Sequence, residues 1–339
     1  LKCSLNSETA PDVRLDTGYE DYLFCSKVES GSGRLGTSGA WTQSTGQLVL
    51  TAGNGGTSQG VACTVTFDLR QAAAEYTPPS VSVNAAIKDG STVLGSIEQV
   101  AMTPPNTPLL GVANGANPLV VVVPEFDTRS IGQSNPLASG TNTITVTLVT
   151  NVNLEQGSVV TISGLTNAAV AGGASYVTLT NVGNGGGSLF SDGATQGRGA
   201  WSSGTLTLTV HTGQTIFVGT EYIFSFQVTN PSDAQDPATV NIAASGTASI
   251  TPASMSPPNL ALLGVINGAN PLLVVCVKGT YASTSSNICI PCGAGKYSAS
   301  VGASSESTCL ECFSGKYLHT EGNDAASDCI ECAEGKFSS

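Results

Sequence analysis

The chain has 339 residues, of which only 11% are charged, and its 24 Asp and Glu against 12 Lys and Arg give a formal net charge of −12. So few basic side chains, spread thinly, exclude a nucleic-acid partner, because phosphate binding needs clustered Lys and Arg. The 40 glycines and the shortage of charge are typical of a turn-rich secreted or surface β-protein rather than a cytosolic enzyme.

Two stretches near the start resemble binding motifs but lack the required context. Carboxylates in ETAPDVRLDTGYEDY suit calcium, yet without EF-hand spacing a solvated acidic face is favoured. The sequence GSGRLG fits a dinucleotide fingerprint, which needs a strand before it and a helix after it. A Gly/Ser loop precedes it and the strand QLVL follows, so we interpret it as a plain loop. The residues are Glu8, Asp12, Asp16, Glu20, Asp21, Gly31, Gly33 and Gly36.

Alternation of apolar and polar residues predicts β-strands through most of the chain. In NTITVTLVT, for example, Ile144, Val146 and Leu148 alternate with threonines. Clusters of Gly, Asn and Pro separate these stretches. We therefore predict an all-β fold of antiparallel, immunoglobulin-like β-sandwiches, with a closed barrel as the less supported alternative. Further alternating positions are Leu206, Leu208, Val210, Tyr222, Phe224, Phe226, Val228, Val240 and Ile242.

The chain repeats itself on two scales. Residues 200–210 echo 40–52, and 224–246 match 66–90 in pattern and order. The segment PPNTPLLGVANGANPLVVVV (104–123) returns as PPNLALLGVINGANPLLVVC (257–276), with 15 of 20 positions identical. Such self-similarity predicts an array of domains. We expect β-sandwich module 1 at 1–103, module 2 at 104–256, a linker or donor strand at 257–275 and a Cys-rich region at 276–339.

Module 1 has no counterpart of the N-terminal part of module 2. Leu23-Phe24 align with Leu189-Phe190, so the strand-like sequence from 104 to about 165 has no counterpart upstream. If Leu1 is the true start, module 1 misses two or three strands and has open sheet edges. Either residues 259–276 of one chain add a strand to module 1 of the next, which builds a head-to-tail filament, or each copy of the repeated segment completes the module preceding it. The candidate donor-strand residues are Leu262, Leu263, Val265, Leu272 and Val274.

Seven of the ten cysteines follow residue 275, and C-x2-C occurs three times with a 20-residue period. The spacing also fits a zinc site, but a secreted module of low apolar content favours disulfides. We predict the pairs Cys276–Cys289, Cys292–Cys309 and Cys312–Cys329, and upstream Cys3–Cys25. Cys63 is then unpaired or exchanges roles. Cys332 has no partner, which indicates that the sequence stops inside a repeat.

The pattern CxxCxxGKYSxxxGAxSxxxC in 289–339 resembles the ephrin-receptor-like, tumour-necrosis-factor-receptor-like Cys-rich repeats of extracellular proteins. The β-modules, with GVANGANPLVVVVPEF, SIGQSNPL and NTITVTLVTNVNLEQGSVVTISGL, are similar to repeats in very large surface proteins of algae and related protists. These resemblances imply a repetitive extracellular protein and carry over no catalytic residue.

Enzymatic activity is not expected. His211 and His319 are the only histidines and belong to different predicted domains, which leaves little material for a Ser-His-Asp or Cys-His constellation. No HExxH, GxSxG or P-loop pattern is present, and we predict no cofactor or metal. No apolar run approaches the roughly 20 residues of a membrane helix.

Pro-Pro pairs beside Ser or Thr mark the module edges and favour an exposed, extended backbone. Such sites suit hydroxylation and O-glycosylation in an alga-like host, whereas the simpler alternative is a stiff linker. A standard N-glycosylation sequon is absent. The candidate positions are Thr77, Pro78, Pro79, Ser80, Thr103, Pro104, Pro105, Ser256, Pro257 and Pro258.

These patterns predict a structural subunit of an extracellular fibril or surface coat, assembled from copies of itself and carrying covalent glycans. The alternative is the ectodomain of a cell-surface adhesion or receptor protein, with the Cys-rich region as its stalk.

Overall fold

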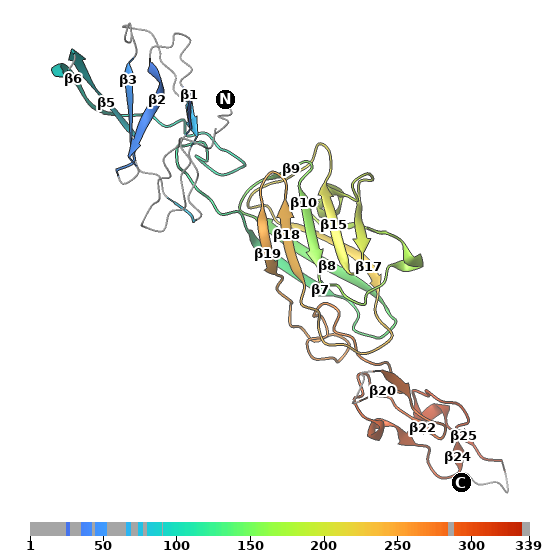
Figure 1. Cartoon of the computed structure of the whole chain (residues 1–339). Helices are drawn as coiled ribbons and strands as arrows, with labels where there is room; N and C mark the ends of the chain where they lie inside the picture. The colour runs from blue at the N-terminus through green and yellow to red at the C-terminus, as the bar shows by residue number, and fades with distance from the viewer. Residues whose placement is uncertain are drawn as a thin grey trace, which may run out of the picture. The chain divides into compact units, whose positions relative to one another are not determined.

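The computed structural model describes residues 25–27, 35–42, 45–52, 66–68, 74–76, 80–89, 91–283 and 288–333. Contacts divide the chain into two units. Unit 1 comprises Leu1–Leu109 and Ala113–Val123, and unit 2 comprises Leu110–Val112 and Pro124–Ser339. The described residues form strands and four short 3₁₀ turns but no α-helix, so the predicted all-β class is confirmed (Figure 1).

Unit 2 contains two antiparallel sheets that face each other (Figure 1). Both sheets contribute to one core, since the rings of Phe190 and Phe224 lie 5.4 Å apart and those of Trp201 and Phe226 lie 6.3 Å apart. The first sheet has the order β11 (Tyr176–Thr178), β14 (Arg198–Ser202), β15 (Thr205–Val210), β10 (Val159–Ser163), β18 (Asn241–Ser245), β19 (Ile250–Ser254), with β13 (Phe190–Ser191) also on β15. The second has the order β12 (Thr180–Gly183), β17 (Tyr222–Thr229), β8 (Thr141–Thr150), β7 (Phe126–Gln133). A small ladder joins β9 (Leu154–Glu155) to β16 (Thr215–Ile216).

The alternating positions predicted from the sequence form this core. In β8 every second residue is buried, and Ile144, Val146 and Leu148 are fully inaccessible. The predicted apolar positions of β15, β17 and β18 are buried in the same way. An antiparallel pair that buries one face of each strand produces this period of two.

The described strands of unit 1 form three antiparallel pairs. They join β1 (Cys25–Lys27) to β4 (Thr66–Asp68), β2 (Leu35–Thr42) to β3 (Gln47–Ala52), and β5 (Ser82–Asp89) to β6 (Thr92–Ala101). The sequence repeat has a structural counterpart here. Trp41 pairs with Leu48 across β2 and β3, as Trp201 pairs with Leu206 across β14 and β15.

The Cys-rich end of unit 2 consists of three two-stranded ladders. These are β20 (Thr280–Ala282) with β21 (Cys289–Pro291), β22 (Lys296–Tyr297) with β23 (Leu310–Glu311), and β24 (Lys316–Tyr317) with β25 (Ile330–Glu331). The 3₁₀ turns are η1 (Ala171–Gly173), η2 (Gly186–Leu189), η3 (Glu306–Thr308) and η4 (Ala326–Asp328). Among the described residues, none forms a helix long and apolar enough to span a membrane.

Candidate functional site: the junction and the Cys-rich stack

The repeated segment folds in the same way in both of its copies. In the second copy, the backbone N–H of Asn259 donates to Oδ1 of Asn270 at 3.0 Å, and Nδ2 of Asn270 donates to Oδ1 of Asn259 at 2.9 Å. Asn106 and Asn117 form the same two bonds in the first copy, each at 2.8 Å. One asparagine pair therefore closes the same loop in both places.

This loop is a series of tight turns, and three of the candidate donor residues, Leu262, Leu263 and Val265, lie within them. Leu262 and Val265 exchange backbone hydrogen bonds of 3.0 and 2.9 Å, which makes residues 262–265 a closed turn. Four positions per copy have a left-handed backbone, a conformation rare outside glycine. They are Asn106, Leu110, Asn114 and Leu119, and their repeat mates Asn259, Leu263, Asn267 and Leu272, with φ between 49° and 63°.

The end of the second copy attaches to the sandwich that precedes it. Val274 and Gln235 exchange backbone hydrogen bonds of 3.0 and 2.9 Å, and Val275 lies parallel to Leu137. Within unit 1 the first copy makes the corresponding contact, because Val121, the repeat mate of Val274, bridges antiparallel to Tyr76. In a single chain, each copy thus contacts the module before it, which is the second of the two arrangements considered from the sequence.

The five candidate donor residues therefore have different environments. Leu272 and Val274 are buried at 0% and 1% exposure, Leu262 and Val265 are half-buried, and Leu263 is 58% exposed. They do not share one extended strand, because the left-handed residues interrupt it.

A buried polar network holds the second copy in place. Nε2 of Gln133 donates to the carbonyls of Gly268 and Leu273, both at 2.8 Å, and Oε1 of Gln133 accepts the N–H of Leu272 at 2.8 Å. Nδ2 of Asn142, in β8, donates to both Gln133 and Asn230 at 2.8 Å. All three side chains are at most 7% exposed. Buried amides that are satisfied in this way fix one geometry, since any rearrangement leaves polar groups unpaired.

The sequence interpretation missed this network. Its signal was available for Asn142, which occupies the inward-facing position two residues before Ile144 in the period of β8. A polar residue at a core position indicates a hydrogen-bonded partner. Nothing in the sequence pattern points to Gln133 and Asn230 as those partners, because they lie 9 and 88 residues away.

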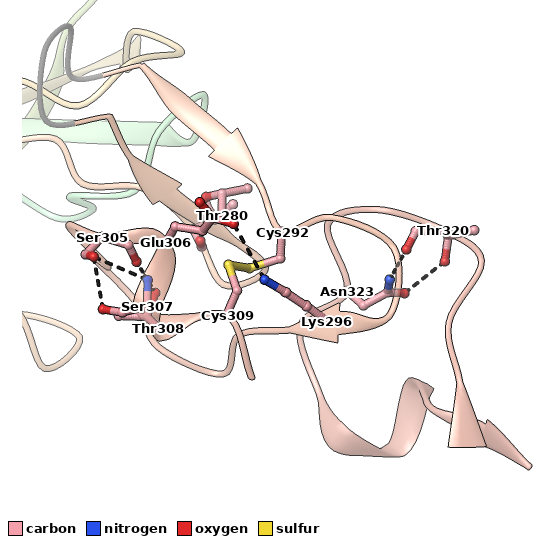
Figure 2. The surroundings of a disulfide bond; sticks show 11 residues. Thr280, Cys292, Lys296, Ser305, Glu306, Ser307, Thr308, Cys309, Thr320 and Asn323 are labelled. Atoms are coloured by element: carbon pink, nitrogen blue, oxygen red, sulfur yellow. Dashed lines mark hydrogen bonds and ion pairs between the residues drawn. A yellow bond between two sulfur atoms is a disulfide. The ribbon is translucent and has the colours of Figure 1, made fainter. Parts of the chain in front are cut away.

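The Cys-rich end contains three disulfides, Cys276–Cys289, Cys292–Cys309 and Cys312–Cys329, which are the three pairs predicted for this region. These disulfides use six of the cysteine thiols that a zinc site would need as ligands. Figure 2 shows the second disulfide, beside which Lys296 Nζ lies 3.6 Å from Glu306 Oε1. Cys332 is half-buried and free. Its repeat mates are Cys292 and Cys312, each of which bonds a cysteine 17 residues later.

Successive Cys-rich repeats stack through backbone hydrogen bonds at equivalent positions. The N–H of Gly302 donates to Cys276 O, and that of Gly322 donates to Cys292 O, both at 2.8 Å. Tyr297 is 8% exposed because Leu318 and Cys329 of the following repeat cover it, whereas its repeat mate Tyr317 is 40% exposed. The repeat that contains Leu318 and Cys329 therefore buries the aromatic residue of the repeat before it, a neighbour-to-neighbour contact of the kind found in quasi-one-dimensional arrays.

With this geometry, the Cys-rich region has a known counterpart. Residues 279–329 match the family described as tyrosine-protein kinase ephrin type A/B receptor-like. The ephrin-receptor-like resemblance noted from the CxxC spacing is confirmed for this region, and the match concerns this region alone. No curated protein matches the chain.

The disulfide-stacked, ephrin-receptor-like region is continuous with the sandwich. Val274 and Val275 pair with the sandwich backbone, and the next residue, Cys276, is 1% exposed and forms the first disulfide. The N–H of Ala138 also donates to Val275 O at 3.0 Å. The segment that leaves the sandwich is thus hydrogen-bonded to it up to the residue before the first disulfide.

The remaining sequence-derived positions do not form one site in the described residues. His211 is half-buried after β15 and its N–H donates to Leu189 O, whereas His319 is exposed in the Cys-rich region. Gly36 lies within β2, not at a strand-to-helix turn. Cys25 begins β1. Ser80, Thr103, Pro104, Pro105, Ser256, Pro257 and Pro258 are all exposed. Cys3, Cys63, Thr77, Pro78, Pro79, Gly31, Gly33 and the acidic stretch from Glu8 to Asp21 lie outside the described residues.

One carboxylate of unit 2 stabilises a surface loop. Among the described residues, no group of three or more His, Cys, Asp or Glu side chains is placed to hold a metal ion. The pKa of Asp192 is lowered chiefly by the backbone N–H of Thr195. Partial burial opposes this shift, and the backbone N–H of Ala194 and the charge of Arg198 add to it. Asp192 Oδ1 accepts both N–H groups, at 2.8 and 3.0 Å, so its charge stabilises a surface loop.

Proposed function

We propose that this chain is part of the ectodomain of an extracellular receptor or adhesion protein, which acts by binding and not by catalysis. The observation that carries the proposal is the ephrin-receptor-like stack of residues 279–329 and its disulfides. Disulfides of this density persist in oxidising compartments. The low charge content and the separation of His211 from His319 support a non-enzymatic role.

The hydrogen-bonded junction supports this proposal. A stalk that displays a binding module at a defined orientation needs a stiff connection, and the hydrogen bonds of Gln133 and Val274 at the junction favour one. Antibodies raised against the sandwich of unit 2 are expected to label intact, non-permeabilised cells. Labelling that requires permeabilisation contradicts the extracellular location.

The second candidate is a subunit of an extracellular fibril or coat, as in the algal and protist surface proteins that the β-modules resemble. It is favoured by one observation, the exposed apolar hairpin β5–β6 of unit 1. Strand donation by residues 259–276 requires the end of that segment to leave its own sandwich, where Leu272 and Val274 are buried. Electron microscopy of the native material separates the candidates, because regular filaments support the fibril and dispersed particles support the ectodomain.

Deleting residues 259–275 tests the strand-donation mechanism itself. If the segment joins chains, the variant folds but does not polymerise. If the segment only completes its own module, the sandwich of unit 2 unfolds at a lower denaturant concentration.

O-glycosylation at the exposed Pro-Pro sites accompanies either function in this proposal. Seven of the ten candidate positions are described and exposed, and so are accessible to a transferase. Intact-mass measurement of native protein is expected to exceed the polypeptide mass, and a mass equal to the bare chain contradicts the modification.

A further inference from the structure

The two copies of the repeated segment contain the same turn, Leu-Gly-Val, at 110–112 and at 263–265. We call residues 110–112 the first tip and residues 263–265 the second tip. Their backbones match, since the leucine and glycine have φ of 49° and 75° in the first tip and of 52° and 81° in the second. Both tips belong to unit 2, so their surroundings can be compared directly.

The first tip is seated on the sandwich of unit 2. The backbone N–H of Asn153, between β8 and β9, donates to Leu110 O at 2.8 Å. Oδ1 of Asn153 accepts the N–H of Val218 at 2.9 Å. The contact at Gly111 is so close that a Cβ there would overlap Oδ1 of Asn153 and Cγ1 of Val218. Asn153 and Val218 therefore form a seat for a tip that has glycine at its centre.

The second tip has no such seat among the described residues. A Cβ at Gly264 would meet no atom within 4 Å. Leu263 is 58% exposed, whereas its repeat mate Leu110 is half-buried, and the next residue after the second tip, Ile266, is 81% exposed. Single exposed aliphatic residues are ordinary. These residues differ from that case because the structure shows what the twin of their turn binds.

The chain's own seat lies out of reach of its second tip. Gln133 holds the second copy of the repeated segment and bonds Asn142 at the start of β8, whereas Asn153 follows the other end of that strand. A strand of 10 residues spans roughly 30 Å. Figure 1 accordingly shows β9 at one end of the sandwich and the segment that follows β19 at the other. Only another molecule can therefore offer a seat to the second tip.

We propose that the second tip docks on the Asn153–Val218 seat of a second copy of this chain, once the first tip of that copy has left it. Leu263 O then accepts the N–H of Asn153, and Gly264 takes the place of Gly111. Because tip and seat lie at opposite ends of one sandwich, the contact is head-to-tail and does not close on itself. The first tip acts as a cap that keeps the seat filled.

This contact differs from strand donation, because Leu272 and Val274 stay buried in their own sandwich throughout. It does not depend on which of the two candidate functions holds. It joins neighbouring ectodomains on a surface, and it lengthens a fibril.

The test empties the seat of the 339-residue chain with Gly111→Ala, whose Cβ overlaps Asn153 and Val218. Sedimentation velocity is run at about 5 µM and about 500 µM, because an interface this small is populated only at high concentration. The wild type is expected to stay monomeric, and the variant is expected to form dimers and longer species at the higher concentration. Hydrogen exchange of the Asn153 N–H is expected to be about tenfold or more faster in the dilute variant than in the wild type, and to slow again on association.

Gly264→Ala, added to Gly111→Ala, places the same Cβ on the second tip and is expected to abolish the association. Gly315→Ala is the matched control, because Gly315 also has a left-handed backbone, with φ of 85°, and open space around its Cβ position. It is expected to leave the association unchanged. Asn117→Ala empties the seat by a second route, since it removes both hydrogen bonds that close the first loop with Asn106.

Three results overturn the proposal. The first is a fast-exchanging Asn153 N–H at both concentrations without association, because the seat is then empty and nothing fills it. The second is association that survives Gly264→Ala, because the molecules are then joined elsewhere. The third is slow exchange at Asn153 in both dilute variants, Gly111→Ala and Asn117→Ala, because the first tip is then not the group that covers the seat.

Discussion

The backbone N–H of Leu272 donates to Oε1 of Gln133 at 2.8 Å, although the two residues are 139 positions apart. That bond links the first strand of the sandwich in unit 2 to the segment that leaves it for the Cys-rich region. Because Gln133 is buried, the bond is shielded from water. If the bond is lost, no water molecule can take the place of the missing partner. The stability of the sandwich and the position of the junction are therefore coupled.

Gln133→Leu is expected to destabilise the sandwich by about 3 kcal/mol, because the substitution leaves the carbonyls of Gly268 and Leu273 and the amide of Asn142 without their partner. Urea unfolding followed by tryptophan fluorescence measures the change. Gln227→Leu, at an exposed position of β17, is the matched control and is expected to have little effect. Equal effects of the two substitutions contradict the network.

Leu272→Ala is expected to cost about 3 kcal/mol, as removal of a fully buried leucine side chain does. Leu263→Ala is the control, since Leu263 has the same left-handed backbone but a side chain that is 58% exposed. Thermal unfolding is expected to show a lower midpoint for the first variant only. If Leu263→Ala were the more damaging change, the loop would pack differently from the arrangement described.

The double substitution of Cys292 and Cys309 by serine removes a disulfide that closes a 17-residue separation. In the chain-entropy model such a crosslink contributes roughly 3 kcal/mol, so the Cys-rich region is expected to become protease-sensitive while the sandwich stays folded. Cys332→Ser is the control, because Cys332 is free and its loss breaks no bond. Protease sensitivity of that control equal to the double variant argues against the pairing.

Tyr297→Ala is expected to loosen the stack, because the phenol ring is covered by Leu318 and Cys329 of the next repeat. Tyr317→Ala, the same substitution one repeat later, removes a side chain that is already 40% exposed and is expected to cost less. Hydrogen exchange of the ephrin-receptor-like region reports both. The repeat-to-repeat packing is refuted if the exposed tyrosine proves the more important of the two.

Asp192 makes the stability of its loop depend on pH. Since its folded pKa is lowered, the carboxylate stabilises the folded state above the unfolded pKa near 3.8, and this contribution disappears as the pH falls through the lower folded value. The carboxyl chemical shift of Asp192 is expected to titrate below that of an unstructured aspartate. Asp192→Asn is expected to flatten the stability profile in this range. If Asp192 in the wild type titrates with the pKa of an unstructured aspartate, the stabilising role of the Thr195 and Ala194 amides is contradicted.

The sequence predicted most of the sandwich because its strands bury one face. Ile144, Val146 and Leu148 show the period of two that such burial imposes. The three disulfides of the Cys-rich region were predictable from the regular 20-residue spacing of its C-x2-C motifs. The conformation of the repeated segment was harder to predict. Its apolar run PLLVVC suggested a strand, but left-handed residues such as Leu263 and Leu272 fold most of the segment into turns, and these depend on the Asn259–Asn270 pair and on contacts with Gln133. Contacts with residues so distant in the sequence cannot be predicted from local composition.

The attachment of each repeated segment to the preceding module has a consequence for how such genes lengthen. The two copies are 153 residues apart, and the segment that closes a module is encoded after it. A tandem duplication with breakpoints just past Val123 and Cys276 copies a sandwich together with its own closing segment. Breakpoints before Pro104 and Pro257 copy residues 104–256 and place the first copy of the repeated segment directly after the sandwich, and the identical positions of the two copies include Gly268, whose carbonyl Gln133 binds. Either duplication therefore leaves every sandwich followed by a closing segment, and the repeated segment allows the array to lengthen by whole modules at either boundary.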